Sequence, residues 1–504
     1  MKKKRIVSTL LALLLFAGLP VSALADTWDI SKGDITVNAG SGGQTVTQGG
    51  GAAVEDGAPV ITGSSTENTV TINADKDQTA NVTLSGVNID VSGEGKAAVS
   101  TNGEGNVSIE LDGDNTLKSG YDHAGLEKNN GGSLTIADKD KNGKLTAKGG
   151  YNGAGIGGGS GKDGSDITIS GGEVEATGVQ GGAGIGGGTS GGGKDIKITG
   201  GEVNATGDYG GAGIGGGTSG GGKDIKITGG EVNATGDYGG AGIGGGFLGA
   251  GSGIIISGGE VRATGGFFGA GIGGGYYGSG SDITISGGEV KATGGENGAG
   301  IGGGVSGKGE GITVSGNTQL KVQGGIGNNS FGTGAGIGNG GSYGTNGAEA
   351  EPDTSDLLTT GWIKYYAPSA NMEKDKPEKT TVGTLSPQEK PIEPIEPAVP
   401  EQPEAERGAD APLYRVTDRD GRDIACTAEQ KGGVLTVTVD EDFAVLTSSL
   451  SGMTALRAQG IEKIIFVTNG AKTAVKLSTI ISKLTANGVF RLTHDGKAVT
   501  FTLG

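Results

Sequence analysis

The chain has 504 residues, of which 113 are glycine, 33% are hydrophobic and 4% are aromatic. Such a composition excludes an ordinary globular domain and leaves either a repeat architecture or disorder. The formal net charge of −17 argues against nucleic acid and anionic membranes as partners. The single cysteine, Cys426, excludes an internal disulfide framework.

Residues 1–25 have the pattern of a secretory signal peptide. They begin with the basic run Lys2–Arg5, continue through the apolar Leu11–Leu15, and end with small residues before Asp26. We therefore expect a secreted protein, extracellular or loosely associated with the cell surface. No later apolar run approaches the roughly 20 residues that span a bilayer, so we expect no membrane insertion.

Residues 26–348 are dominated by a repeat of 29 residues, and the segment Thr189–Gly217 recurs letter for letter at Thr218–Gly246. A disordered linker would keep no such register. Aliphatic columns share the period and can form a core. The isoleucine of the motif GAGIGGG recurs at Ile156, Ile185, Ile214, Ile243, Ile272 and Ile301, and a valine recurs at Val174, Val203, Val232, Val261 and Val290.

Each repeat predicts three short strands separated by glycine-rich corners. The segments DIKIT and EVNAT alternate apolar and polar residues, and GAGIG places Ala and Ile on one side. If each repeat makes one turn, identical positions stack about 4.8 Å apart along parallel sheets. Left-handed helices use hexapeptides, which a period of 29 does not accommodate. The predicted fold is mainly β: a right-handed parallel β-helix with a 29-residue turn.

Three segments follow the repeats. Residues 349–372 contain GWIKYYAPS, which predicts a cap packed on the last turn. Residues 373–412 are rich in Pro, Glu and Lys, which is typical of an extended linker. Residues 413–504 predict a small α+β domain, a candidate site for a protein partner, with His494 beside a hairpin turn rather than in a catalytic role. Its helical patterns lie near Thr447–Gln459 and Lys472–Leu484.

The tandem pattern AGIGGG...DITISGGEVEATGG, preceded by NVTLSGVNIDV, resembles the secreted carbohydrate-binding β-helix proteins of anaerobic Gram-positive bacteria. The resemblance covers about Val60–Gly340. That family is structurally akin to pectate lyases and is associated with calcium. The resemblance implies a plant or other cell-wall polysaccharide as the partner, and Ca²⁺ as a possible cofactor.

Aromatic residues break the repeat at its corners, and we interpret them as candidate sugar-binding residues. Sugar rings have apolar faces and polar edges, which suits exposed aromatic rings beside backbone polar groups. The strand rise predicts two aromatic lips about 20 Å apart on either side of the flat strand Gly269–Gly275. Shielding of the corners, or packing on another protein, is the alternative. The candidates are Phe247, Phe267, Phe268, Tyr276 and Tyr277, with Tyr151, Tyr209 and Tyr238 in the same corner column.

The segment DKDKNG resembles the first half of a calcium loop. Asp138, Asp140 and Asn142 stand at alternate positions, and Gly143 stands where such a loop bends sharply. The twelfth position is Gly149 rather than Glu, so the bidentate ligand is missing. A turn built on Asn142–Gly143 is therefore the alternative to a metal site formed by the three side chains.

A column of glutamates on the face opposite the valines is either a charged face that prevents association of sheets or a cation-binding surface. By its resemblance to pectate lyases, the chain could use Arg262 as the base of a lyase, with Lys291 as a helper and Glu231, Glu260 and Glu289 as metal ligands. The repeats carry no large loops to wall a cleft. We therefore expect a polysaccharide-binding protein without catalysis, with a structural or adhesive surface rod as the alternative and a calcium-dependent lyase third.

Overall fold

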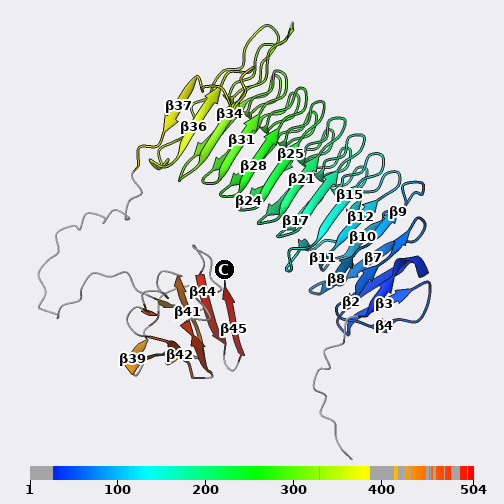
Figure 1. Cartoon of the computed structure of the whole chain (residues 1–504), viewed down its shortest axis with the longest axis vertical. Helices are drawn as coiled ribbons and strands as arrows, with labels where there is room; N and C mark the ends of the chain where they lie inside the picture. Colours follow the sequence, from blue (N-terminus) through cyan, green and yellow to red (C-terminus); the bar gives the residue numbers. More distant parts are fainter. Residues whose placement is uncertain are drawn as a thin grey trace, which may run out of the picture. The chain divides into compact units, whose positions relative to one another are not determined.

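The computed structural model describes residues 26–328, 330–385, 414–417, 424, 426–431, 433–449, 453, 456–457, 461–469, 471–477, 489–495 and 498–503. The chain divides into two compact units, Met1–Pro391 and Ile392–Gly504, which Figure 1 shows. The predicted signal peptide, residues 1–25, lies outside the described residues, as does most of the predicted linker. Among the described residues, no helix is both long and apolar enough to cross a membrane.

The first unit is a parallel β-solenoid whose coils pass through three sheets, here named A, B and C. This confirms the prediction of a mainly β protein with a parallel β-helix. Sheet A contains β1 (Thr27–Asp29), β5 (Val60–Thr62), β8 (Thr79–Ser85), β11 (Asn106–Asp112), β14 (Leu134–Ala137), β17 (Gly164–Ile169), β20 (Gly193–Ile198), β23 (Gly222–Lys223), β24 (Lys226–Ile227), β27 (Gly251–Ile256), β30 (Gly280–Ile285) and β33 (Gly309–Val314).

Sheet B contains β2 (Ile35–Gly40), β3 (Gly43–Gln48), β4 (Val54–Glu55), β7 (Val70–Ala74), β10 (Val99–Gly103), β13 (Leu126–Lys128), β16 (Ile156–Gly157), β19 (Ile185–Gly186), β22 (Ile214–Gly215), β26 (Ile243–Gly244), β29 (Ile272–Gly273), β32 (Ile301–Gly302) and β35 (Ile337–Gly338). A short 3₁₀ turn, η1 (Ile30–Lys32), follows β1. Strands β3 and β4 run antiparallel beside β2, so an antiparallel pair closes the first coils.

Sheet C contains β6 (Ser64–Ser65), β9 (Asn88–Asp90), β12 (Asp114–Lys118), β15 (Lys144–Lys148), β18 (Glu173–Thr177), β21 (Glu202–Thr206), β25 (Glu231–Thr235), β28 (Glu260–Thr264), β31 (Glu289–Thr293), β34 (Gln319–Gln323), β36 (Trp362–Tyr366) and β37 (Lys379–Val382). The strands of each coil pair with their counterparts in the next coil, as the 29-residue period predicts. Ile156 pairs with Ile185, and Val174 pairs with Val203. These aliphatic columns are fully buried and form the core.

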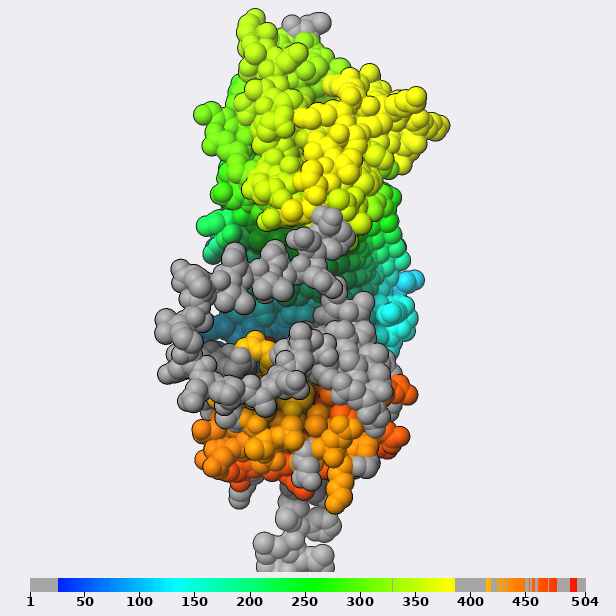
Figure 2. Space-filling model, turned by 90° about the vertical axis from the view of Figure 1, so that its left-hand side faces the viewer, coloured from blue at the N-terminus to red at the C-terminus, as the bar shows by residue number. Residues whose placement is uncertain are grey.

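The solenoid extends beyond the predicted limit of residue 348. Strand β36 adds a parallel strand to sheet C, and β37 pairs antiparallel with β36. Ile363 and Tyr365 of β36 are buried and complete the core. The predicted linker therefore begins too early, because part of its first residues folds as β37. In Figure 2 these last residues, in yellow, follow the green coils at the end of the unit.

The second unit has two four-stranded sheets. One joins β38 (Arg415–Thr417), β41 (Phe443–Ser449), β44 (Val489–Asp495) and β45 (Ala498–Leu503), and the other joins β39 (Thr427–Lys431), β40 (Val434–Thr438), β42 (Lys463–Val467) and β43 (Lys472–Lys476). The hairpin around Asp495 is confirmed.

Two helix predictions in the second unit are corrected. The described start of Lys472–Leu484 is strand β43, because it pairs antiparallel with β42 and Val475 packs against the core, whereas the residue after the strand, Leu477, is helical. The start of Thr447–Gln459 belongs to β41, where Leu446 and Ser448 alternate inward. Within that segment, the helical residues among those described are Met453, Leu456 and Arg457.

Candidate functional site

Each coil carries a narrow lobe in which the two glycine-rich corners around a sheet B strand come together. The amide of Phe247 donates to the carbonyl of Gly210 at 2.6 Å, and the amide of Tyr276 donates to that of Gly239 at 2.7 Å. The corner after the GAGIGGG motif of one coil therefore lies against the corner before it in the preceding coil. This contradicts the expectation of two aromatic lips about 20 Å apart.

The corner aromatics instead form one contiguous row, here called the aromatic ridge. The ring centroids of Phe268 and Tyr276, on opposite sides of the same motif, are 4.9 Å apart. Neighbouring centroids along the row are separated by between 4.0 and 6.4 Å. The ridge consists of Tyr209, Tyr238, Phe247, Phe267, Phe268, Tyr276, Tyr277, Phe331 and Tyr343.

Three of these aromatic contacts involve residues that sequence reasoning missed. Phe331 and Tyr343 extend the ridge past the last regular repeat. Tyr121 stacks on Tyr151 with centroids 4.9 Å apart, as a pair separate from the ridge. Alignment of SGYDHAG with GGYNGAG places Tyr121 in the column of Tyr151, so the repeat contained the signal.

Exposure divides the ridge into an outer and an inner set. Tyr209, Tyr238, Phe267 and Tyr277 are exposed, whereas Phe268 and Tyr276 are partly buried. The hydroxyl groups of Tyr276 and Tyr277 are 2.9 Å apart. Burial, and then this hydrogen bond, raise the pKa of Tyr276 to about 12, so its hydroxyl stays protonated at neutral pH.

Two hollows run along the corner between sheet C and the lobes. One, of about 410 Å³, is lined by Tyr121, Tyr151, Lys118 and Lys148 among others. The next, of about 340 Å³, is lined by Asp208 and Asp237, the residues that precede two ridge tyrosines. The two hollows share Lys148 and Val179, so they form one groove beside the aromatic residues.

The side chains proposed for calcium form a turn in the structure. Both carboxylate oxygens of Asp138 accept backbone hydrogen bonds, from Asn142 at 3.3 Å and Gly143 at 3.1 Å. The side-chain amide of Asn142 donates to the carboxylate of Asp112 at 3.0 Å. The side chain of Asp140 is exposed. This geometry is that of the alternative interpretation, a corner between β14 and β15 built on Asn142–Gly143.

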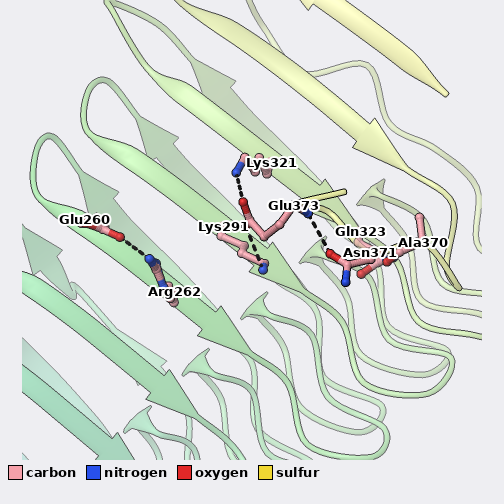
Figure 3. Close-up of polar contacts among 8 residues, drawn as sticks. All are labelled: Glu260, Arg262, Lys291, Lys321, Gln323, Ala370, Asn371 and Glu373. Carbon is pink, nitrogen blue, oxygen red and sulfur yellow. Dashed lines mark hydrogen bonds and ion pairs between the residues drawn. The ribbon is translucent and has the colours of Figure 1, made fainter. Parts of the chain in front are cut away.

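The outer face of sheet C carries the residues considered for a lyase. Arg262 pairs with Glu260 of its own strand, and Lys291 pairs with Glu373 of the cap segment at 3.2 Å, as Figure 3 shows. The ammonium group of Lys321 pairs with the same carboxylate, that of Glu373, at 2.8 Å. Hydrogen bonds from Lys321 and then Lys291 lower the pKa of Glu373. Both candidate lyase cations are therefore engaged by carboxylates of this chain.

The glutamate column is stacked as expected, since Glu202 pairs with Glu231 and Glu231 with Glu260 along sheet C. At its start, Lys144 donates to Glu173 at 2.7 Å and to Glu175 at 3.0 Å, which lowers the pKa of Glu175. Among the described residues, no group of three His, Cys, Asp or Glu side chains could hold a metal ion. Glu231, Glu260 and Glu289 are therefore not grouped as a metal cluster in the part of the chain that the structure describes.

His494 lies in β44 beside the β44–β45 hairpin turn, as predicted, and its side chain is fully buried. Its Nδ1 lies 3.1 Å from the hydroxyl of Thr468, and its Nε2 lies 3.0 Å from that of Thr473. Burial lowers the pKa of His494, so the ring is neutral at pH 7. Both ring nitrogens are occupied within the fold, which supports a structural role.

Six segments of the chain match the family model described as a beta helix repeat: residues 141–160, 167–189, 196–218, 225–247, 254–276 and 283–305. Five of the six run from a strand of sheet A through sheet C and the lobe, and all share the 29-residue period. Comparison with curated proteins and with solved structures found no match. Together with the three sheets of paired strands, the matched segments show that residues 141–305 contain beta-helix repeats.

Proposed function

We propose that this protein binds a polysaccharide, without transforming it, at the aromatic corner of its solenoid. The observation that carries the proposal is the gathering of exposed rings on one corner of successive coils. Tyr121, Tyr151, Tyr209 and Tyr238 are between 44% and 61% exposed, and Phe267 and Tyr277 continue the series. A repeat built for architecture alone could leave polar residues at these positions, as the chain does at Gln180 and Glu296 in the tyrosine column and at Ser190 and Ser219 in the column of Tyr277.

Sugar chemistry fits this corner better than the other faces. The C–H groups of a pyranose pack against aromatic rings, and its hydroxyls need polar partners nearby. The groove beside the rings supplies Lys118, Lys148, Asp208 and Asp237. Among the described residues, the exposed rings Tyr121, Tyr151, Tyr209, Tyr238, Phe267 and Tyr277 lie at these corners and not in the strands of sheet A.

Binding without catalysis is supported by the state of the candidate catalytic groups. Arg262 and Lys291 are paired with Glu260 and Glu373. A catalytic base needs a free proton-accepting group facing a walled site. An extracellular location, predicted from residues 1–25, would place the corner where cell-wall polysaccharides occur.

The test is retention of the full chain on an array of plant and microbial polysaccharides, with calcium and with chelator. A variant with Tyr151, Tyr209, Phe267 and Tyr277 all changed to Ala should lose about tenfold or more in affinity, because each ring contributes apolar contact area. The control changes Lys197 and Lys226 of sheet A to Ala and should bind as the unmodified chain does. Circular dichroism checks that both variants keep the fold.

Other outcomes would redirect the proposal. No retention on any polysaccharide would contradict it and favour the structural rod. Retention accompanied by new absorbance of unsaturated sugars would contradict binding without catalysis. Loss of retention in chelator would make calcium part of the site.

A further inference from the structure

The tyrosines of the corner column are stacked on one another, so most of their faces are not available to a ligand. Tyr121 and Tyr151 are parallel within 5°, and Tyr209 and Tyr238 are parallel within 11° with centroids 5.9 Å apart. Each pair joins adjacent coils, so the ring faces point along the coil axis. Within a pair, the facing surfaces cover each other, and Tyr238 also contacts the rings of Phe247 and Phe268.

The free faces of Tyr151 and Tyr209 point toward the same intervening coil. Tyr151 has Tyr121 on one side, and Tyr209 has Tyr238 on the other. The coil between them carries Gln180 in the tyrosine column, and Val179 where the following repeats carry aspartate. Tyr151 and Tyr209 are thus two coils apart, which is about 10 Å at the sheet spacing.

We infer that this gap, the tyrosine slot formed by Tyr151, Val179, Gln180 and Tyr209, binds one pyranose ring between two tyrosine faces. The inference rests on the proposed polysaccharide-binding function and locates its primary site. Carbon atoms in contact lie about 3.5 to 4 Å apart. Gln180 is half-buried in this interval, so its side chain must turn outward before a sugar ring can enter. Two such contacts and the thickness of a puckered ring then fill the interval of about 10 Å.

The walls of the slot supply both apolar and polar contacts. Tyr151 is 44% exposed and Tyr209 is 61% exposed, so their faces are open to solvent. Val179 lines both hollows of the groove and adds an apolar side chain next to Gln180. The backbone amide of Gln180 donates to Asp208 at 2.8 Å, which fixes the corner.

The side-chain amide of Gln180 is the polar partner of the ligand. It makes no hydrogen bond with the residues that the structure describes. A glutamine amide both donates and accepts, so it can bind two hydroxyls at the edge of a sugar ring. The hydroxyl of Thr189 donates to the backbone carbonyl of Gln180 at 2.9 Å, so this bond engages the backbone and not the side-chain amide.

The slot selects for the configuration of the sugar. A pyranose whose hydroxyls are all equatorial presents C–H groups on both faces, and two aromatic faces can cover it without burying a hydroxyl. An axial hydroxyl, as in a galacto-configured ring, would be desolvated against a tyrosine face without a partner. The slot therefore takes a β-linked gluco-configured ring, and its equatorial linkages leave in the plane of the ring through the open sides of the slot.

The repeat itself provides a variant that closes the slot without disturbing the fold. Gln180 has φ 50°, close to φ 44° at Tyr209 and φ 48° at Tyr238 in the same column. Gln180→Tyr should therefore cause no backbone strain, and the new tyrosine ring should continue the stack from Tyr151 to Tyr209. We expect an unchanged or higher melting temperature and at least tenfold weaker binding of a β-1,4-linked glucose tetrasaccharide, measured by calorimetry on the full chain.

Matched variants separate the slot from the rest of the corner. The double change Tyr151→Ala and Tyr209→Ala should weaken binding as Gln180→Tyr does, whereas Phe267→Ala with Tyr277→Ala should leave it unchanged. In the corresponding β-1,4-linked galactose tetrasaccharide, the axial O4 of each linked ring carries the glycosidic bond, so the neighbouring sugar would meet a tyrosine face. This tetrasaccharide should therefore bind at least tenfold more weakly than the glucose one.

The outcomes distinguish this inference from the function on which it rests. If Gln180→Tyr still binds polysaccharide and the variant with Phe267→Ala and Tyr277→Ala does not, the tyrosine slot is not the binding site. The proposed polysaccharide-binding function would still stand in that case. Equal affinity for the two tetrasaccharides overturns the assignment to gluco-configured rings. If the unmodified chain binds no saccharide at all, both proposals fail together.

Discussion

One column of the repeat requires a backbone conformation that few residues adopt. In the column formed by Asp166, Asp195 and Asp282 within strands of sheet A, and by Asp224 between β23 and β24, φ lies between 52° and 55°. The same position is glycine in two other coils, Gly253 at φ 64° and Gly311 at φ 62°. Aspartate and glycine alternate here because both tolerate the left-handed region, whereas a side chain branched or extended at Cβ is strained there.

We predict that Asp224→Ala and Asp224→Gly have different effects on stability. Asp224 is exposed, and its ion pair with Lys223 is long at 3.9 Å, so loss of the carboxylate costs little. Alanine in the left-handed region should lower the free energy of unfolding by about 1 kcal/mol, whereas glycine should change it by less than about 0.5 kcal/mol. Urea unfolding of the full chain measures the free energy of unfolding of both variants. Equal decreases in the two variants would show that the stability at this position depends on the carboxylate and not on the positive φ.

Residues differ in how far the sequence alone predicted their place. The buried columns of Ile156 and Val174 followed from the period, because a repeat forces identical side chains to stack. The corner rings were found, but their separation was predicted wrongly. That separation depends on hydrogen bonds such as Tyr276 to Gly239, which join residues of different coils and leave no local pattern. The free faces of Tyr151 and Tyr209 follow only from the stacking geometry.

At the scale of elements, the end of the solenoid is closed by a clip that composition did not reveal. The carboxylate of Glu373 bridges Lys291 of β31 and Lys321 of β34. The amide of Gln323 donates to the carbonyl of Ala370 at 2.8 Å, which fastens the same segment to sheet C. Proline and charge predicted a linker from residue 373, whereas these contacts hold its first residues against the coils.

We predict that this clip makes the protection of β36 and β37 depend on pH. The pKa of Glu373 lies below its ordinary value of 4.5 in the folded chain, so the unfolded cap binds the proton more readily. The stabilisation is therefore complete above about pH 4.5 and is lost as the pH falls through the lowered pKa. Hydrogen exchange of the β37 amides, corrected for intrinsic rates, should accelerate over that range.

Glu373→Gln should remove this step, because its side chain does not titrate. In this variant, the β37 amides should exchange faster at pH 7 than those of the unmodified chain. Their exchange should not accelerate further when the pH is lowered. Glu310→Gln is the matched control, since Glu310 pairs only with Lys308 at 3.8 Å on sheet A. A similar acid step in the Glu373 variant would mean that other carboxylates fasten the cap.

For the whole molecule, the 29-residue period means that coils are interchangeable units of length. Each coil contacts its neighbours through the same columns, so stability is approximately a sum over coils and their interfaces. The identical copies Thr189–Gly217 and Thr218–Gly246 show this most directly. Their residues pair with one another in register, as Ile214 with Ile243 and Val203 with Val232.

Deletion of Thr218–Gly246 should therefore shorten the solenoid by one coil and leave it folded. The junction places Gly217 before Phe247, which restores the neighbours that every coil already has. At about 0.05 to 0.15 kcal/mol per residue, the loss of 29 residues should lower the free energy of unfolding by about 1.5 to 4 kcal/mol. Deletion of 15 residues from the same copy should prevent folding, because it puts the buried columns out of register.

The same deletion tests whether binding belongs to one place or to the length of the solenoid. It removes Tyr238 but keeps Tyr151, Gln180 and Tyr209, so the tyrosine slot stays complete. If the slot carries binding, affinity for the glucose tetrasaccharide should change by less than about threefold, as expected for a site whose own contacts are unchanged. A loss of tenfold or more in a variant that circular dichroism shows to be folded would mean that the ligand extends over the deleted coil.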